Sequence, residues 1–282
     1  MTGTVRQSAK RGLFASGWYD QRISRLTFPG VVVLCYHGVR LSSWRSDERA
    51  FPDLHVAPDT FEAHCSILTR TCHPIDLAAW RRAQSGQAEL PARPVLVTFD
   101  DGYRSVFEVA RPILKQHDIP AAVFVSTQAV ERQESFWFDQ EARRAPSPEI
   151  SRDDPLAPMT IGQVRTMSDE GFEIGAHTVS HPVLAAQPPD MQRRELAECC
   201  DTLEAWTGRR PTAMAYPFGK PNTDYSPETV SIVRHLGFEF GFTTCPDFVR
   251  AGQSPLERSR FLVLAEVSPS ELAHRIGYSW HS

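Results

Sequence analysis

Four short segments of this chain carry most of the side chains that can do chemistry. Each follows an apolar run typical of a β-strand, and they are Tyr36-His37-Gly38, Thr98–Gly102, His177–His181 and Tyr216–Gly219. Parallel strands end at one edge of their sheet, and folds built from them place active sites there. The sequence therefore predicts that carboxylates, imidazoles and a proline-stiffened aromatic loop share one site.

Asp100 and Asp101 are adjacent carboxylates that directly precede Gly102. Neighbouring side chains at a strand end point in different directions, so one can bind a metal while the other takes a proton from metal-bound water. The alternative interpretation is a helix N-cap followed by a turn, which Asp-Asp-Gly also satisfies.

His177 and His181 are spaced four residues apart, and Pro182 ends their segment. If the segment forms one helical turn, both imidazoles lie on one face and can bind one divalent ion. Two imidazoles and a carboxylate are typical of a catalytic zinc site, where one position stays open for water. Cobalt, nickel or iron suit the same ligands. A chance pair of surface histidines is the alternative.

Aromatic residues supply candidate substrate contacts. Tyr216, Pro217, Phe218 and Gly219 predict a stiff turn that forms one wall of a pocket and aims a backbone N–H, for which Tyr216 is the candidate, at a developing oxyanion. The alternative is an ordinary turn that ends a strand. Trp137, between two phenylalanines, is expected either to stack on a ring of the substrate or to plug the space beneath an insertion.

The elements that must position these residues alternate along the chain. Seven or eight strands alternating with helices predict an α/β fold, a distorted (β/α) barrel, with a doubly wound open sheet as the main alternative. The polar segments 41–58 and 131–158 are expected to cover the active-site face. The expected strands are 31–36, 74–77, 95–99, 121–126, 172–176, 212–216, 238–243 and 261–264, and the expected helices are 61–71, 106–116, 161–170, 191–207 and 226–236. Start signals precede three of these helices at Asp59-Thr60, Thr160 and Asp190.

Composition narrows the class of protein. With 282 residues, 41% hydrophobic and 23% charged, the chain is typical of a folded protein with one large core, which we place in residues 31–282. A net charge of -4 argues against a nucleic-acid partner. The six cysteines form no CxxC pair and favour a reducing compartment, and Cys35 is expected to be a small core residue. The first residues lack the apolar stretch of a secretory signal, which favours a cytoplasmic location.

Residues 1–30 form a separate, basic segment. Lys10, Arg11, Arg22 and Arg25 are interleaved with apolar side chains. The pattern fits an amphipathic helix that makes peripheral contact with a membrane surface. The alternative is a helix packed across the bottom of the barrel, or a partly frayed tail.

Together these motifs resemble the NodB-homology polysaccharide deacetylases, a family of metal-dependent carbohydrate esterases with a distorted barrel. The resemblance extends from Leu34–Gly38 to the region of Arg260 and is carried by Thr-Phe-Asp-Asp-Gly followed by His-Thr-x-x-His. It implies that Asp100 is the general base, and that Asp101, His177 and His181 bind the metal. The implied reaction removes an N-acetyl group from an amino sugar in a saccharide or glycolipid.

The chain departs from the family pattern at two places. Met214-Ala215 stand where the family often has an arginine that holds the base, and Arg260 is the candidate to replace it; we group it with the substrate-binding residues. The late histidine that serves as general acid in many members is also missing, because His274 falls in a helical pattern. His37 is our candidate acid; the alternative is that it only orients a loop or the substrate.

The sequence also allows two other functions. One is hydrolysis of a different carbon–nitrogen bond, in a small-molecule amide or a formyl group. The other is a catalytically silent, saccharide-binding relative. The intact Asp100, Asp101, His177 and His181 favour an enzyme with a divalent metal, for which zinc is the first expectation.

Overall fold

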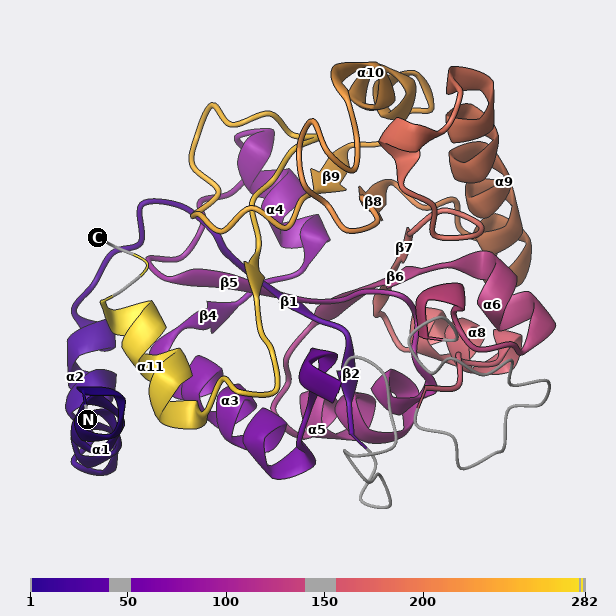
Figure 1. Ribbon diagram of the computed structural model, residues 1–282. Coiled ribbons are helices and arrows are strands. Elements are labelled where there is room, and N and C mark those ends of the chain that lie inside the picture. The colour runs from indigo at the N-terminus through magenta and orange to yellow at the C-terminus, as the bar shows by residue number, and fades with distance from the viewer. Residues whose placement is uncertain (1, 41–51, 140–155, 279, 281–282) are drawn as a thin grey trace.

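A curled parallel sheet forms the centre of the protein (Figure 1). The structure, a computed structural model, describes residues 2–40, 52–139, 156–278 and 280. The strand order is β10-β1-β5-β6-β7-β8-β9, with β4 paired to β5, and β2 pairs separately with β3. The strands are β1 (Val32–Tyr36), β2 (Gly38–Val39), β3 (His55–Val56), β4 (His73–Pro74), β5 (Pro94–Phe99), β6 (Ala121–Val125), β7 (Glu173–Ala176), β8 (Ala213–Ala215), β9 (Phe240–Phe242) and β10 (Phe261–Leu262).

The segment that leads into β10 joins the two edges of this sheet. Arg258 forms a parallel bridge with Phe242 of β9, and Phe261 pairs with Leu34 of β1. From β1 through β9 the strand order follows the chain without the reversal that defines a doubly wound sheet. The predicted distorted (β/α) barrel is therefore confirmed, and the open doubly wound alternative is wrong.

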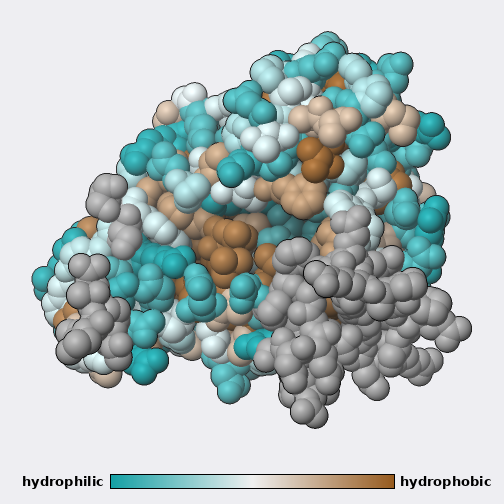
Figure 2. Space-filling model, in the orientation of Figure 1, coloured by the Kyte–Doolittle hydropathy of each residue, from teal (hydrophilic) through white to brown (hydrophobic). Residues whose placement is uncertain are grey.

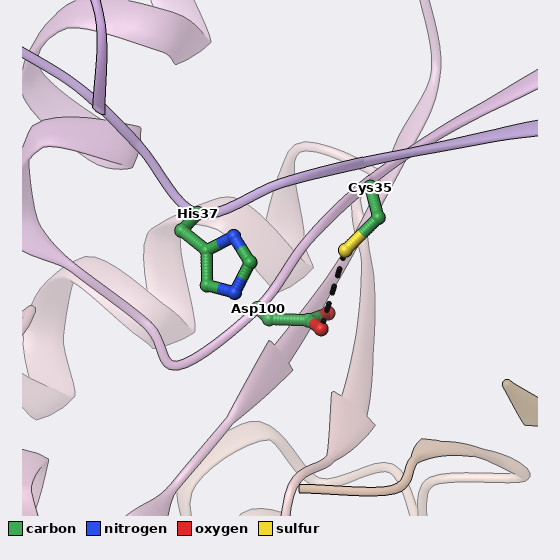
Figure 3. A group of neighbouring side chains, drawn as sticks. All are labelled: Cys35, His37 and Asp100. Atoms are coloured by element: carbon green, nitrogen blue, oxygen red, sulfur yellow. Dashed lines mark hydrogen bonds between the residues drawn. The ribbon is translucent and has the colours of Figure 1, made fainter. Parts of the chain in front are cut away.

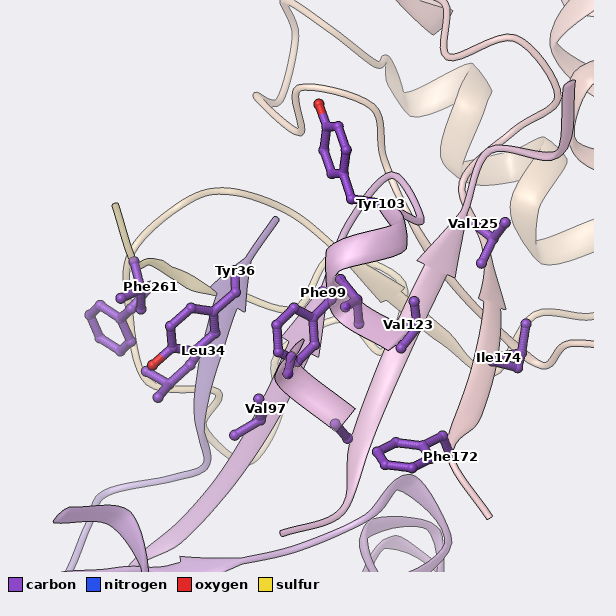
Figure 4. Packing of buried hydrophobic residues seen from close by; sticks show 14 of the residues in the cluster. Leu34, Tyr36, Val97, Phe99, Tyr103, Val123, Val125, Phe172, Ile174 and Phe261 are labelled. Atoms are coloured by element: carbon purple, nitrogen blue, oxygen red, sulfur yellow. The ribbon is translucent and has the colours of Figure 1, made fainter. Parts of the chain in front are cut away.

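Both faces of the strands are buried, which explains their nearly continuous apolar sequence. Leu34, Val97 and Val123 pack between the sheet and the outer helices (Figure 4). Alternate residues such as Leu96 and Phe124 point the other way, into the interior of the curl. Each strand thus contributes to two apolar layers and leaves its polar chemistry to the residues at its end.

Helices surround the sheet, except for α4, whose Leu77 and Trp80 pack inside the curl. The helices are α1 (Thr2–Ala15), α2 (Trp18–Ser24), α3 (Pro58–Thr71), α4 (Leu77–Gln84), α5 (Arg111–Gln116), α6 (Thr127–Arg132), α8 (Ile161–Asp169), α9 (Pro189–Thr207), α10 (Pro227–His235) and α11 (Pro269–Gly277). Short 3₁₀ turns occur at Pro52–Leu54 and Leu184–Ala186.

Prolines account for the main differences from the expected helices. The expected helix over 106–116 divides into a π-helical turn, Val106–Ala110, and α5. Pro112 has no N–H to donate to a preceding carbonyl, so the regular ladder cannot pass through it. Two helices also begin earlier than expected, at Pro58 and Pro189, because proline suits the first helical position. Thr160 forms the expected cap, as part of a capping box with Gln163.

The N-terminal helices pack on the side of the barrel, against α11 and α3. Tyr19 and Ile23 of α2 are buried, and the Trp18 ring stacks on Tyr278. Lys10 of α1 forms an ion pair with Glu271 of α11 at 2.6 Å. Much of the apolar side of this segment is thus used inside the protein, and the division at residue 30 stays a prediction. In the described part of the chain, no helix has the length and hydropathy needed to cross a bilayer.

We expect His64 to make the protein less stable in mild acid. Its ring is buried on α3, with Nδ1 3.2 Å from the Tyr36 hydroxyl. Burial lowers the pKa of His64 from its ordinary 6.5 to about 4. The folded state therefore binds fewer protons than the unfolded state between these values, so stability is full above pH 6.5 and falls as the pH drops toward 4.

The effect can be isolated by comparing variants. From pH 7 to pH 5 the contribution of His64 to the free energy of unfolding should fall by about 2 kcal/mol. Urea unfolding at both pH values measures this fall in the free energy of unfolding, and His64→Gln should abolish the part that His64 contributes. His235→Gln changes an exposed histidine and should retain it. Equal pH dependence in wild type and His64→Gln would contradict the prediction.

Candidate active site

The four predicted segments meet at the carboxyl ends of β1, β5, β7 and β8. A cavity of about 290 Å³ lies among them. On the face shown in Figure 2, apolar side chains gather near the centre, over the strands labelled β1 and β10 in Figure 1. The cavity is lined by His37, Leu54, Asp100, Asp101, Phe138, His177, His181, Phe218, Thr244 and Leu262. Leu54 and Phe138 belong to the two expected covering segments, of which residues 41–51 and 140–155 lie outside the described residues.

Asp101, His177 and His181 direct three donor atoms toward one another. Asp101 Oδ1 lies 3.3 Å from His177 Nε2 and 3.4 Å from His181 Nε2. All three side chains are buried, and Asp101 Oδ1 has no hydrogen-bond partner. Oxygen and nitrogen donors converging in this way are the ligand set of a mononuclear zinc-type site. The residues therefore fit a divalent ion.

Electrostatics favour the metal-binding states of Asp101 and His181. Burial lowers the pKa of His181 to about 3, so its imidazole is neutral. Burial raises the pKa of Asp101, but the nearby histidines outweigh it and lower that pKa, so the carboxyl stays ionised. His177 Nδ1 lies 2.8 Å from the carbonyl oxygen of Ala215, which orients the ring so that Nε2 faces Asp101. Burial lowers the pKa of His177, but Asp101 and Asp100 outweigh it and raise that pKa.

The two histidines meet without the helical turn that the sequence suggested. Residues 177–181 form an irregular loop, in which Thr178 and His181 have φ values of 68° and 56°. Asp101 likewise has a φ of 71°. Residues other than glycine rarely adopt such positive φ values, and they do so mainly where function requires the geometry. The helical-turn prediction is wrong, although both imidazoles still reach Asp101.

Glu195 of α9 holds this loop, and sequence reasoning missed it. One carboxylate oxygen accepts hydrogen bonds from the backbone N–H groups of Val179 and Ser180, each at 2.9 Å. The other oxygen accepts from the Ser180 hydroxyl at 2.7 Å. Nothing in the sequence marks Glu195, which falls among other charged residues on a helix. Only the docking of α9 beside β7 shows its role in orienting the loop.

Asp100 lies beside the metal-type cluster and is held by Arg260. The guanidinium donates to both carboxylate oxygens at 2.7 Å, and both side chains are buried. Burial alone raises the pKa of Asp100, but Arg260 outweighs it and holds that pKa well below its usual value. Arg260 is 0% exposed and does not line the cavity, so it positions Asp100, as expected of a replacement for the arginine that is missing at residues 214–215. Its grouping with the substrate-binding residues is wrong for this reason.

Cys35 and His37 flank the same carboxylate (Figure 3). The Cys35 thiol lies 3.4 Å from Asp100 Oδ2, so this buried cysteine contacts the site as well as filling space in the core. His37 lines the cavity, and its Nδ1 is buried with no hydrogen-bond partner. One nitrogen of His37, Cys35 Sγ and an Asp100 oxygen lie within 4.8 Å of one another. His37 is therefore placed where a proton donor would be useful.

The aromatic loop after β8 is only partly in the site. Phe218 lines the cavity and is 41% exposed, and its ring lies against His181. Tyr216 is buried against Tyr225, and its backbone N–H donates to Phe242 O at 3.0 Å. That N–H is a sheet donor, so the expectation that it faces an oxyanion is wrong. Pro217 and Gly219 are also absent from the lining of the cavity.

Trp137 lies at the mouth of the site, as a half-exposed ring that is 40% accessible. Its indole N–H donates to the His181 carbonyl at 3.1 Å, and its ring lies near Phe218. Phe136 and Phe138, in contrast, are buried, and Phe138 also lines the cavity, which Trp137 does not. The phenylalanines therefore fill the space beneath the insertion, and stacking of Trp137 on a sugar ring stays a prediction.

We expect Arg260→Gln to shift the pH profile of catalysis and to weaken the fold. A base must be ionised, and Arg260 lowers the pKa of Asp100. Without that charge the pKa of Asp100 rises, so the acidic limb of kcat/KM moves to higher pH. Stability should fall by about 3 kcal/mol, because a buried carboxylate loses its partner.

Kinetics between pH 4 and pH 9 and urea unfolding test this prediction. Arg250→Gln removes an exposed arginine on the same part of the chain and serves as the control. An unchanged acidic limb in Arg260→Gln would show that the guanidinium does not tune the base.

Comparisons with known proteins agree with this fold. Residues 87–241, more than half of the chain, match the family model described as polysaccharide deacetylase. The chain therefore belongs to the polysaccharide deacetylase family. The Streptococcus pyogenes deacetylase PplD, solved with acetate, is 26% identical with a TM-score of 0.71, covering 88% of this chain and 98% of its own. The structure of IcaB from Ammonifex degensii is 25% identical with a TM-score of 0.69, covering 89% of this chain and 99% of its own.

A curated Bacillus subtilis (strain 168) protein, "Putative polysaccharide deacetylase YxkH", is also similar. It is 25% identical over 218 residues, which make up 76% of this chain and 64% of the relative. The chain thus spans less than two thirds of the length of that relative. The likeness supports the family.

Proposed function

We propose that this protein is a metal-dependent hydrolase that removes N-acetyl groups from a saccharide or glycolipid containing amino sugars. The observation that carries the proposal is the convergence of Asp101, His177 and His181 next to Asp100, which Arg260 holds ionised. A nucleophile-activating site and a paired base are what amide hydrolysis requires. Membership of the polysaccharide deacetylase family supports an acetylated saccharide as the substrate class.

Each residue of the site has a distinct role in this proposal. Asp101, His177 and His181 hold the ion, and zinc fits their nitrogen and oxygen donors. When bound, a divalent ion of this kind acts as a Lewis acid toward the amide carbonyl and makes water more acidic. Asp100 accepts the proton of the attacking water, and Arg260 fixes the direction of its carboxylate.

Amide hydrolysis also needs a proton donor for the leaving amine. The water oxygen bonds to the acetyl carbon, the carbon–nitrogen bond breaks, and the sugar nitrogen takes a proton. His37 faces the cavity beside Asp100 and supplies that proton. Trp137 and Phe218 offer aromatic faces against which a sugar ring can pack. The products are acetate and a free amino sugar.

Acetate release tests the proposed activity directly. The purified protein, supplied with Zn²⁺, should release acetate from N-acetylglucosamine oligomers. Formamides and small cyclic amides, assayed in parallel, would reveal hydrolysis of another carbon–nitrogen bond. A metal-loaded protein that releases acetate from none of a panel of N-acetylated saccharides would contradict the proposal and favour a silent binding protein.

Location and membrane contact are also proposals. All six cysteines are unpaired, which supports a reducing compartment such as the cytoplasm. Peripheral membrane contact through residues 1–30 would use Leu13, which is 38% exposed, and the basic side chains near it. A flotation assay with anionic vesicles measures that contact, and Leu13→Glu should reduce it.

A further inference from the structure

A second cavity lies at the opposite end of the barrel from the candidate active site. Its volume is about 730 Å³, which is within the range of small-molecule sites. Val31 and Pro94, at the beginnings of β1 and β5, line it, whereas His37 and Asp100 follow the ends of the same strands. Apolar side chains form much of the wall, including Phe28, Trp80, Leu90 and Val249. The cavity therefore shares no residue with the candidate active site.

Arg258 lines this cavity and is buried without an acidic partner. It is 3% exposed, and its guanidinium lies 4.4 Å from the Trp80 ring and 5.0 Å from the Phe240 ring. Its Nε has no hydrogen-bond partner, and no ion pair to Arg258 occurs within the described residues. A buried cation is normally paired, because its removal from water is unfavourable. The contacts with the two aromatic rings offset only part of the free-energy cost of burying this cation.

Arg258 and Arg260 have different surroundings, although they are close in the sequence. The two arginines are two residues apart on an extended segment, so both point into the barrel interior. Arg260 donates to both oxygens of Asp100 at 2.7 Å. Arg258 points toward the other end and meets aromatic rings instead of a carboxylate. Burial lowers the pKa of Arg258 to about 10, and it remains charged at neutral pH.

The rest of the lining also suits an anion. Gln253 Oε1 is a second buried polar atom in the cavity wall that has no hydrogen-bond partner. Arg250 adds a positive charge, although it is exposed and lies 3.5 Å from Asp247. Glu89 is the acidic residue of the lining, and it is exposed. The buried charge that a ligand meets is therefore the Arg258 guanidinium.

We propose that this second cavity binds an amphiphilic oxyanion, with its carboxylate or phosphate paired to Arg258 and its apolar body against Trp80 and the neighbouring side chains. A planar guanidinium matches such an oxyanion through two parallel hydrogen bonds. The apolar wall contributes affinity for the body of the ligand. This site is independent of the proposed deacetylase activity.

Binding of simple probes tests the proposal. Octanoate and octyl phosphate, kept below their micelle concentrations, carry both features; octanol lacks the charge and acetate lacks the apolar body. Isothermal titration of the full chain should give a Kd for octanoate or octyl phosphate at least ten times lower than for octanol or acetate. The stronger of the two anions identifies the head group. Equal affinity for octanol and the anions, or no binding of any probe, would overturn the proposal.

Substitutions of Arg258 test whether this residue binds the anionic group of the ligand. Arg258→Met should remove the preference for the anions over octanol, and Arg258→Lys should keep the preference with weaker affinity. Arg82→Met, on the exposed side of α4 and outside the lining of the cavity, is the matched control and should bind as wild type does. Unliganded Arg258→Met should melt no lower than wild type, because it loses an unpaired buried charge. A marked fall in its Tm would mean that Arg258 has a structural partner and would overturn the proposal, as would undiminished anion binding by Arg258→Met.

Discussion

Asp100→Asn is expected to lower kcat/KM for acetate release by about 10³-fold while leaving the metal content unchanged. An amide cannot accept the proton that the proposed base removes from water. The ligand atoms belong to Asp101, His177 and His181 and are not altered by the substitution. Metal analysis of the same preparation that is assayed kinetically separates loss of the base from loss of the ion.

Two matched variants complete this experiment. Asp101→Asn makes the same chemical change one residue further along and should lose both activity and metal. Asp190→Asn, on the exposed first turn of α9, should behave as wild type. Asp100→Asn also leaves Arg260 buried without its anion, so the free energy of unfolding should fall by about 3 kcal/mol. The assays are therefore run well below the melting temperature of this variant. An Asp100→Asn protein that has lost its metal would show that Asp100 is a ligand.

Removal of the metal is expected to abolish activity, with recovery when the ion is returned. Dialysis against a chelator should take the metal content from about one ion per chain to none. Activity should follow that content, because each of the three ligands belongs to the same buried cluster. Reconstitution with Zn²⁺, Co²⁺ and Ni²⁺ in separate samples then determines which ion supports turnover.

The corresponding variant is His177→Gln, which removes a ligand that Ala215 orients. It should bind less than a tenth of the metal of wild type and lose activity in proportion. His235→Gln, on the exposed surface of α10, is the control. Full activity in chelated wild-type protein would remove the basis for a metal role and leave Asp100 to act by another mechanism.

Local sequence patterns were sufficient to predict the fold and the positions of the main candidate residues. The apolar runs before His37, Asp100 and His177 mark strands that are buried on both faces. Parallel strands connected by helices end at the same edge, so the residues that follow them must come close together. This is why the convergence of Asp101 with His177 was predictable, although 75 residues lie between them in the printed sequence.

Other features depended on contacts that no local pattern encodes. Glu195 lies on a charged helix and becomes important only because α9 packs beside the loop of His177–His181. The Tyr216 N–H donates to Phe242 because β8 pairs with β9, and no pattern in the sequence near Tyr216 indicates that pairing. The loop itself uses positive φ values instead of a helical turn, since hydrogen bonds from outside the segment determine its backbone.

By itself, then, the sequence determined the alternation of strands and helices and the placement of the candidate site residues at strand ends, because each follows from spacing within a few residues. The roles of metal ligand and base are what the resemblance to the family implies. The tertiary structure decided which groups meet across the barrel. Arg260 reaches Asp100 across 160 residues of chain, while Arg258 on the same face reaches only aromatic rings. Closure of the sheet sets the direction of each side chain on residues 258–262, and that closure depends on the packing of the whole core.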